Sequence, residues 1–385
     1  MSLVQAQDFP AADKCTYLNS ASVALMYKGA EEAAVAWQRD IAEYGTLNFD
    51  EVAEDRVFDE LRDAFATLIG AQADDIAVAS SATELIASLA WALAPPKGKN
   101  IVGVDVVFPS TMYPWTRVAR HTGCDVRWVK ARDIQVREED IIAAIDDDTA
   151  AVVLSHVEYG SGQRYDLAKI GAAAHAHGAL LIVDTTQAIG GVPVDIEKEP
   201  VDALIAGSYK WMCGPFGVGL LYLTPHLQAT LDPGLVGWRS HKVIYQLQAD
   251  RIEYLNTARR FEFSTMAYGC AIGLTRSIRF LADVGVERIY RHNMQLTDKL
   301  IAALESAGGR IASPTAGPWR TSIVSVRFAA ADSQSVVRHL TSKNIVVSPR
   351  RDFVRISIHL YNGENDLDRL MGALTPFLKQ PHRAS

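Results

Sequence analysis

Short apolar runs alternate with helical segments between residues 76 and 223, and this alternation restricts the possible folds most. The runs have the length of buried strands and cover residues 76–79, 100–107, 125–129, 150–155, 180–183, 203–206 and 219–223. Helical patterns fall between them at residues 81–93, 113–122, 141–145 and 165–177. Repeated β–α alternation is typical of a parallel sheet with helices on both faces, so we predict an α/β fold.

The pattern changes near residue 267, where two long helical segments begin. They cover residues 268–282 and 286–307, and shorter strands and helices follow to residue 378. Because 385 residues are many for one hydrophobic core, two domains are expected. We predict a large domain at residues 15–266 and a smaller α+β domain at residues 267–385, on which residues 1–14 pack.

Composition argues against several classes of partner. The chain has 38 Lys and Arg against 45 Asp and Glu, a formal net charge of −7, and no basic block. Nucleic acid and anionic membranes are therefore not expected as main partners, and no apolar stretch is long enough to span a bilayer. The four cysteines are scattered without a Cys-x-x-Cys pair, which indicates a reducing cytoplasm and predicts no metal site.

Two neighbouring apolar runs end in chemically useful residues. Asp184 ends one run, and Ser208-Tyr209-Lys210 follows the next. In a parallel sheet these ends meet along one edge, where open α/β sheets bind ligands. The carboxylate and the lysine could form a plain salt bridge. They could also serve pyridoxal phosphate (PLP), which needs a lysine for its Schiff base and a carboxylate at its pyridine nitrogen.

PLP also needs a phosphate cup of N–H and hydroxyl groups, preferably at a helix N-terminus. Small hydroxyl residues between Ser80 and Glu84 open a predicted helix, which is N-cap chemistry. The same geometry would present the N–H groups of Ala82 and Thr83 to a phosphate, although a simple cap explains the pattern equally. A dinucleotide site is disfavoured because no Gly-x-Gly-x-x-Gly follows the first strand.

With these parts in place, the chain resembles the class V aminotransferase family of fold-type I PLP enzymes. That family includes cysteine desulfurases, kynureninases and isopenicillin N epimerases. The resemblance extends from Tyr17-Leu18-Asn19 to Asp368-Arg369-Leu370. It implies a large domain with a mostly parallel seven-stranded sheet, a smaller α+β domain, an amino-acid substrate, and a homodimer with shared active sites.

Motifs in family order imply the cofactor residues. Asp184-Thr185-Thr186-Gln187 resembles Asp-x-x-Gln, which implies Asp184 at the pyridine nitrogen and Gln187 near the ring hydroxyl. Ser208-Tyr209-Lys210 resembles the lysine motif, which implies that Lys210 forms the Schiff base and that Ser208 and Tyr209 lie at the phosphate. The catalytic residues implied are Lys210 and Asp184, and the cofactor-binding residues are Ala82, Thr83, Phe108, Asp184, Gln187, Ser208, Tyr209, Lys210 and Thr265.

Three further motifs support the resemblance. Phe108-Pro109-Ser110 is similar to the kynureninase pattern, in which the phenylalanine stacks on the cofactor ring. Residues 261–265 resemble Phe-Glu-x-Gly-Thr, which implies that Thr265 reaches the phosphate of the other subunit. The segment around Arg355 resembles the C-terminal Arg-x-Ser motif, which implies that Arg355 and Asn19 bind the substrate. A guanidinium fork suits an α-carboxylate.

The chain departs from the desulfurase pattern before Arg355. Desulfurases carry a catalytic cysteine there, whereas residues 347–352 contain none. Glu158 and Tyr159 occupy a loop where relatives place a polar residue near the ring hydroxyl. Arg350 and Arg351 are extra cations, which either bind a second acidic group of the substrate or are simply solvated.

The implied function is that of a PLP-dependent enzyme acting on an α-amino acid through an external aldimine and a quinonoid. A lyase reaction, by C–S or other β-elimination, or an epimerase reaction without a catalytic cysteine is favoured. A class V aminotransferase is the alternative, and a catalytically inactive binding protein of the same fold is the alternative from another class. The sequence does not choose among these reactions because they diverge after the same loss of the α-proton.

Overall fold

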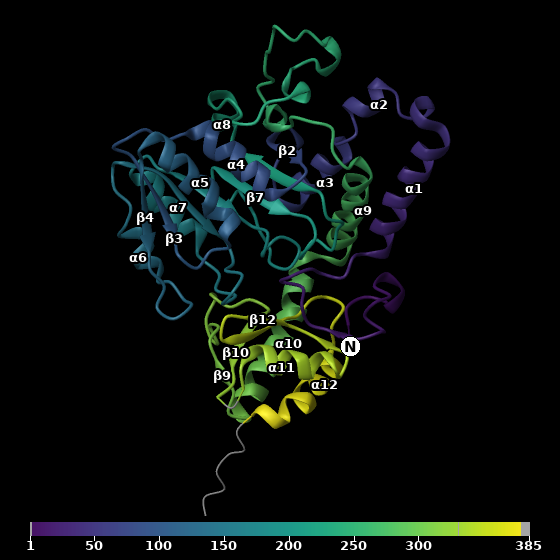
Figure 1. The fold of residues 1–385 in the computed structure, drawn as a ribbon, viewed down its shortest axis with the longest axis vertical. Helices are drawn as coiled ribbons and strands as arrows, with labels where there is room; N and C mark the ends of the chain where they lie inside the picture. The colour runs from purple at the N-terminus through teal and green to yellow at the C-terminus, as the bar shows by residue number, and fades with distance from the viewer. Residues whose placement is uncertain (1, 330, 379–385) are drawn as a thin grey trace, which may run out of the picture.

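The computed structural model describes residues 2–329 and 331–378. Residue 1 and residues 379–385, at the outer ends of the predicted domain ranges, lie outside the described residues. A seven-stranded sheet occupies the upper part of the molecule in Figure 1, and a four-stranded sheet occupies the lower part. The predicted α/β fold with a mostly parallel central sheet and a smaller C-terminal α+β part is confirmed.

The seven-stranded sheet has the order β2-β8-β7-β6-β5-β3-β4. Only β8 runs antiparallel to its neighbours, β2 and β7. The other pairings are parallel, and the register sets Asp184 beside Ile205. The strands are β2 Ile76–Ala79, β3 Asn100–Val104, β4 Asp125–Val129, β5 Thr149–Ser155, β6 Leu180–Asp184, β7 Ala203–Gly207 and β8 Gly219–Leu223.

Helices surround this sheet, and four of those described connect its strands (Figure 1). The connecting helices are α4 Ala82–Leu93, α5 Pro109–Thr122, α6 Glu138–Ile142 and α7 Leu167–Ala176. A second group packs together near β2 and consists of α1 Lys28–Tyr44, α3 Asp59–Ile69 and α9 Tyr268–Val284. The short helices α2 Glu51–Asp55 and α8 Pro225–Thr230 complete this part. None of the helices in the described ranges has the length and apolar character needed to cross a membrane.

The four-stranded sheet is antiparallel and has the order β12-β13-β10-β9. Its strands are β9 Arg310–Ile311, β10 Ile323–Arg327, β12 Ser348–Arg350 and β13 Phe353–Ser357. Three helices pack with it, α10 Val286–Ser306, α11 Ser333–Thr341 and α12 Glu364–Leu374. Buried aliphatic side chains form a separate core between these elements, as with Leu300, Val336, Ile356 and Leu370.

The N-terminal segment packs on the C-terminal part and forms a separate two-stranded sheet with it. Strand β1 Thr16–Tyr17 pairs in parallel with β11 Ile345–Val346. Upstream of it, the backbone N–H of Leu3 donates to the carbonyl of Leu360, and Phe9 packs its ring against Tyr361. The chain therefore begins against the C-terminal part before it enters the large sheet.

Two helix boundaries differ from the sequence expectations. The apolar residues of 52–69 have the spacing of one helix, which predicts a single element there. Instead α2 ends at Asp55 and α3 begins at Asp59, after Phe58, which is fully buried with its ring against Tyr268. Helix α5 begins at Pro109 rather than at residue 113, because proline at the first helical position has its φ already set for a helix. The earlier start brings Ser110 and Thr111 into the first turn of α5.

Candidate active site

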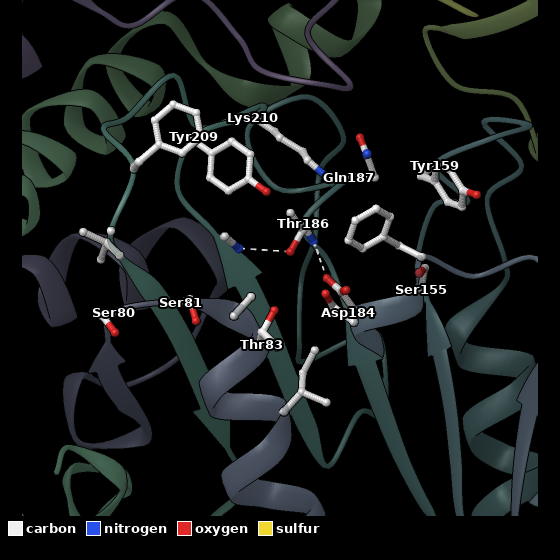
Figure 2. A pocket seen from close by; sticks show the side chains of 18 residues that line it. Ser80, Ser81, Thr83, Ser155, Tyr159, Asp184, Thr186, Gln187, Tyr209 and Lys210 are labelled. Carbon is white, nitrogen blue, oxygen red and sulfur yellow. Dashed lines mark hydrogen bonds between the residues drawn. The ribbon is translucent and has the colours of Figure 1, made fainter. Parts of the chain in front are cut away.

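A cavity of about 210 Å³ opens at the carboxyl ends of β6 and β7 (Figure 2). Because these strands are parallel, the residues that follow them meet at this edge. The predicted cofactor residues that line the cavity are Ala82, Thr83, Phe108, Asp184, Gln187, Tyr209 and Lys210. Polar residues outside the predicted cofactor set also line it, namely Ser80, Ser81, Ser110, Ser155 and Thr186.

The carboxylate of Asp184 is held in one orientation from two sides. It ends β6 and is 8% exposed. The hydroxyl of Thr111 donates to Oδ2 at 2.8 Å, and the backbone N–H of Thr186 donates to Oδ1 at 2.9 Å (Figure 2 shows the second bond). Each oxygen has a further lone pair, so the carboxylate can accept another hydrogen bond from the cavity.

Lys210 places an amine in the same cavity. Its side chain is 6% exposed, and Nζ lies 5.2 Å from the centre of the Phe108 ring. Burial lowers the pKa of Lys210 to about 8, against the opposing charge of Asp184. Lys210 and Asp184 do not form an ion pair within the described residues, so the salt bridge that the sequence also allowed is not present. A lysine amine with this pKa is a better nucleophile near neutral pH than an exposed one.

The start of α4 faces the cavity from below in Figure 2. Ser81 is the N-cap, and its Oγ accepts from the backbone N–H of Glu84 at 3.2 Å. Strand β8 passes so close that a Cβ on Gly219 would lie 2.5 Å from the backbone nitrogen of Ala82. The N–H groups of Ala82 and Thr83 therefore lie at a helix N-terminus that lines the cavity, which suits an anion.

Two aromatic pairs form the walls. Phe108 and Tyr159 meet edge to face, with ring centres 5.4 Å apart. Tyr209 and Phe216 are stacked, with ring centres 4.5 Å apart and planes 19° apart. Phe108 is 41% exposed, so its ring is available to a planar ligand.

Gln187 lines the cavity, but its amide is engaged elsewhere. Its Nε2 donates to the carbonyl of Ala21 at 2.9 Å, and its Oε1 accepts from Nε1 of Trp211 at 2.8 Å. These two bonds fix the amide plane and leave one N–H of Nε2 for a further acceptor.

Two of the predicted cofactor residues do not line this cavity, namely Ser208 and Thr265, of which Thr265 is predicted to reach the phosphate of the other subunit. Ser208 is fully buried and donates its hydroxyl proton to the carbonyl of Pro215, which closes the turn after β7. Thr265 is exposed on the surface, where its hydroxyl lies 3.3 Å from Nε1 of Trp238. In this chain, therefore, neither hydroxyl lies beside the amine of Lys210.

Neither of the predicted substrate residues, Arg355 and Asn19, lines this cavity. Arg355 is 1% exposed, and its Nη1 donates to the carbonyl of Tyr159 at 2.7 Å. Burial, strengthened by the charge of Arg350, lowers the pKa of Arg355 to about 9. Asn19 is bridged through its backbone to Ser357 at the end of β13, and within the described ranges its buried Oδ1 has no hydrogen-bond partner.

Glu158 and Tyr159 point in different directions. Tyr159 lines the cavity, whereas Glu158 is fully buried and accepts from the hydroxyl of Tyr165 at 3.2 Å. Burial raises the pKa of Glu158 to about 8, so this side chain is mostly protonated at neutral pH. Of the two residues, only Tyr159 is placed to contact a ligand in the cavity.

Similarity to known proteins extends over most of the chain. The Aminotransferase class-V family model matches residues 46–370. An uncharacterized aminotransferase, YcbU of Bacillus subtilis, is 27% identical over 361 residues, which is 94% of each chain. A probable cysteine desulfurase of Methanothermobacter thermautotrophicus is 32% identical over 255 residues, covering 66% of this chain and 63% of the other.

A solved structure shares the fold. It is the complex of the cystine C–S lyase C-DES with its reaction product, cysteine persulfide. The structures align with a TM-score of 0.88 at 24% identity, covering 96% of this chain and 100% of that one. At this identity the likeness concerns the fold.

Proposed function

The chain belongs to the class-V aminotransferase family and is a PLP-dependent enzyme, and we propose that Lys210 carries its cofactor while Asp184 keeps the pyridine nitrogen protonated. One observation carries this proposal. A buried amine of lowered pKa shares a cavity with a carboxylate that is fixed by two hydrogen bonds. When bound, PLP supplies an electron sink for negative charge at the substrate α-carbon.

The remaining lining residues fit the other parts of the cofactor. The start of α4, with the N–H groups of Ala82 and Thr83, suits the phosphate. Phe108 offers its exposed ring as a stacking face, and the free N–H of Gln187 suits a ring hydroxyl. The hydroxyl of Tyr209, which lines the cavity, can take the place of that of Ser208, which bonds to Pro215 instead.

Lys210 also suits the proton transfer that starts amino-acid chemistry. Whenever it is not bonded to the cofactor, its Nζ would be available to take the α-proton of a bound amino acid. A pKa of about 8 matches that task because a general base works best with a pKa near the working pH. Arg355 holds the substrate carboxylate in this proposal and thereby orients the α-carbon toward Nζ.

The cysteines support a reaction without a sulfur-accepting thiolate. All four lie in the described part of the chain, and none lines the cavity. Burial raises the pKa of Cys15, Cys213 and Cys270, which keeps these thiols protonated. We therefore favour a lyase reaction, by C–S or other β-elimination, or an epimerase reaction, with class V transamination as the alternative. The free cysteines also fit the proposed cytoplasmic location.

A homodimer with shared sites is part of the proposal. Residues 231–257 project from the top of the molecule in Figure 1 and expose several apolar side chains, Val236, Val243, Leu247 and Ile252. Such a surface is typical of a protein interface. Thr265 lies exposed against Trp238 of this segment, where a second subunit could use it. Mixing Lys210→Ala with Thr265→Ala protein should restore activity through hybrid dimers, whereas a monomer at working concentration would exclude sharing.

The decisive experiment combines cofactor labelling with product analysis. Borohydride should fix PLP on the peptide that contains Lys210, and label on another lysine would overturn the assignment. The enzyme is then incubated with a panel of α-amino acids that includes S-substituted cysteines. A lyase forms product without a 2-oxo acid co-substrate, an aminotransferase consumes one in equal amount, and an epimerase changes only optical rotation. An inactive binding protein gives none of these signals with any member of the panel.

A further inference from the structure

The hairpin of β12 and β13 presents two arginines on one face. Ser348 pairs with Arg355, and Arg350 pairs with Phe353. Because side chains alternate along a strand, Ser348, Arg350 and Arg355 extend from the same face, with the arginines as diagonal neighbours. Arg351 differs from both, since it occupies the turn with a φ of 49° and an exposed side chain.

The two guanidinium groups converge on one hydroxyl. Nη2 of Arg355 donates to Oγ of Ser22 at 2.5 Å, and Nη2 of Arg350 donates to the same oxygen at 3.0 Å. With both lone pairs occupied, the hydroxyl proton of Ser22 is directed to Oγ of Ser348 at 2.9 Å. The other acceptors of the pair are the carbonyls of Tyr159 and Pro349, so all the acceptors of these two cations are neutral.

This pair has no carboxylate partner in the described part of the chain. Arg355 is 1% exposed, and its Nε makes no hydrogen bond there. Burial lowers the pKa of both Arg355 and Arg350, and no carboxylate counteracts it. Because a buried cation is costly unless it is paired, the arrangement suits negative charge that comes from outside the chain.

The arginine pair adjoins the proposed PLP cavity. Tyr159 lines that cavity and also a smaller one of about 40 Å³, which Arg350 lines as well. The carbonyl of Tyr159 accepts from Arg355. The charges of both arginines lower the pKa of Lys210, so they act on the proposed reacting amine.

We propose that Arg350 and Arg355 together select an α-amino acid whose side chain carries an anionic group. Arg355 binds the α-carboxylate, as in the proposed function on which this inference rests, and Arg350 binds the side-chain acid. A neutral substrate would leave Arg350 on the hydroxyl of Ser22, without the stronger bond between two charged groups. This assignment decides between the two roles that the sequence allowed for Arg350. It gives no substrate contact to Arg351, whose exposed side chain also lines the smaller cavity but makes no bond to Ser22.

The test titrates the PLP-loaded enzyme with matched amino acids while the cofactor absorbance is followed. L-aspartate is compared with L-asparagine, and L-glutamate with L-glutamine. Arg350→Gln should weaken binding of the preferred acidic amino acid by about tenfold or more and of its neutral partner by less than about twofold. Arg350→Lys keeps the charge but loses the fork, so its loss should be intermediate.

Arg338→Gln is the matched control, because it removes the same charge from an exposed position on α11 that lines neither of the two cavities. This control should change neither the affinity for the acidic amino acid nor the affinity for its neutral partner. Equal losses for acidic and neutral amino acids in Arg350→Gln would mean that both arginines hold one carboxylate, and that result would overturn the proposal. The absence of any preference for aspartate or glutamate in the unaltered enzyme would overturn it as well.

Binding of succinate and propionate gives a second readout that needs no reaction at the cofactor. Calorimetry should show that Arg350→Gln loses affinity for succinate, which has two carboxylates, and keeps its affinity for propionate, which has one. If the purified protein holds no PLP, the proposed function fails, while the succinate measurement still tests the arginine pair. If Arg350→Gln binds succinate as tightly as the unaltered protein does, the proposal that Arg350 and Arg355 bind two separate carboxylates is refuted by that result alone.

Discussion

The hydroxyl of Thr111 on α5 donates a 2.8 Å hydrogen bond to Oδ2 of Asp184 at the end of β6. The N–H of Thr186 binds the other carboxylate oxygen. The two bonds come from different elements, so the carboxylate plane is fixed before any ligand enters. We infer that Thr111 positions the residue that is proposed to contact the pyridine nitrogen.

Thr111→Val should therefore slow turnover without removing the cofactor. Valine has the shape of threonine but no donor, and a buried acceptor that loses its partner costs about 1–3 kcal/mol. If that energy orients Asp184 in the transition state, kcat falls roughly 10- to 100-fold. Thr111→Ser keeps the donor and should retain most of the activity. A valine variant with normal kcat and a normal visible spectrum would contradict this role.

Asp184→Asn tests the carboxylate itself. Asparagine keeps the size of the side chain and loses the negative charge that favours a protonated pyridine nitrogen. PLP should remain bound through Lys210 and the start of α4, while turnover drops by orders of magnitude because the electron sink weakens. Bound cofactor is measured by absorbance after gel filtration, and kcat is measured on the same sample. Near-normal turnover would refute the assignment.

Asp184 and Lys210 could be found from the sequence because one ends a buried strand and the other follows shortly after one. The carboxyl ends of parallel strands share an edge, so strand order alone brings these two side chains together. Thr111 could not be found in this way. Apolar spacing placed the start of its helix at residue 113, and its contact with Asp184 spans 73 residues. No local pattern reports such a contact.

For Ser208 the sequence predicts the position in the chain but not the direction of the side chain. Its position after β7 was correct, but the direction of its hydroxyl depends on the carbonyl of Pro215, which the turn brings back toward it. The strand β12 was missed for a related reason. It has three residues, which is too short for a periodic signal, and it is defined only by its register with β13. The arginine pair was therefore visible in the sequence only as two neighbouring cations.

The rate of covalent PLP capture by the apo-enzyme should rise with pH through about 8 and then level off. Burial holds the pKa of Lys210 at about 8, below its ordinary value of 10.5, and only the neutral amine attacks the cofactor aldehyde. The measurement is the growth of visible absorbance at a series of pH values. A rate that continues to rise toward pH 10.5 would show that the amine is not buried as described.

The free energy of unfolding of the apo-enzyme should also depend on pH because of the lowered pKa of Lys210. Between pH 8 and 10.5 the unfolded state binds a proton at Lys210 that the folded state does not, so this group makes stability rise with pH. Below pH 8 the buried ammonium costs roughly 3 kcal/mol. Lys210→Met should therefore be the more stable protein in urea at pH 7, and its advantage should shrink toward pH 10.5. An advantage that does not change with pH would contradict the lowered pKa.

Gly219→Ala tests the contact between β8 and the start of α4. A Cβ at this position would lie 2.3 Å from the carbonyl carbon of Ser81, and backbone atoms cannot move aside as a flexible side chain can. The helix start must shift, so we expect a loss of about 1–3 kcal/mol in unfolding free energy. The affinity for PLP should also fall about tenfold or more if the phosphate is held there.

The matched control for this variant is Gly372→Ala in α12. A Cβ there meets no atom within 4 Å, and alanine favours a helix by up to about 1 kcal/mol over glycine. That protein should be as stable as the parent or slightly more stable, with the same dissociation constant for PLP. If Gly219→Ala is destabilised but binds PLP as tightly as the control, the phosphate is not held at the N-terminus of α4. A shifted helix start would weaken PLP binding if the phosphate were held there.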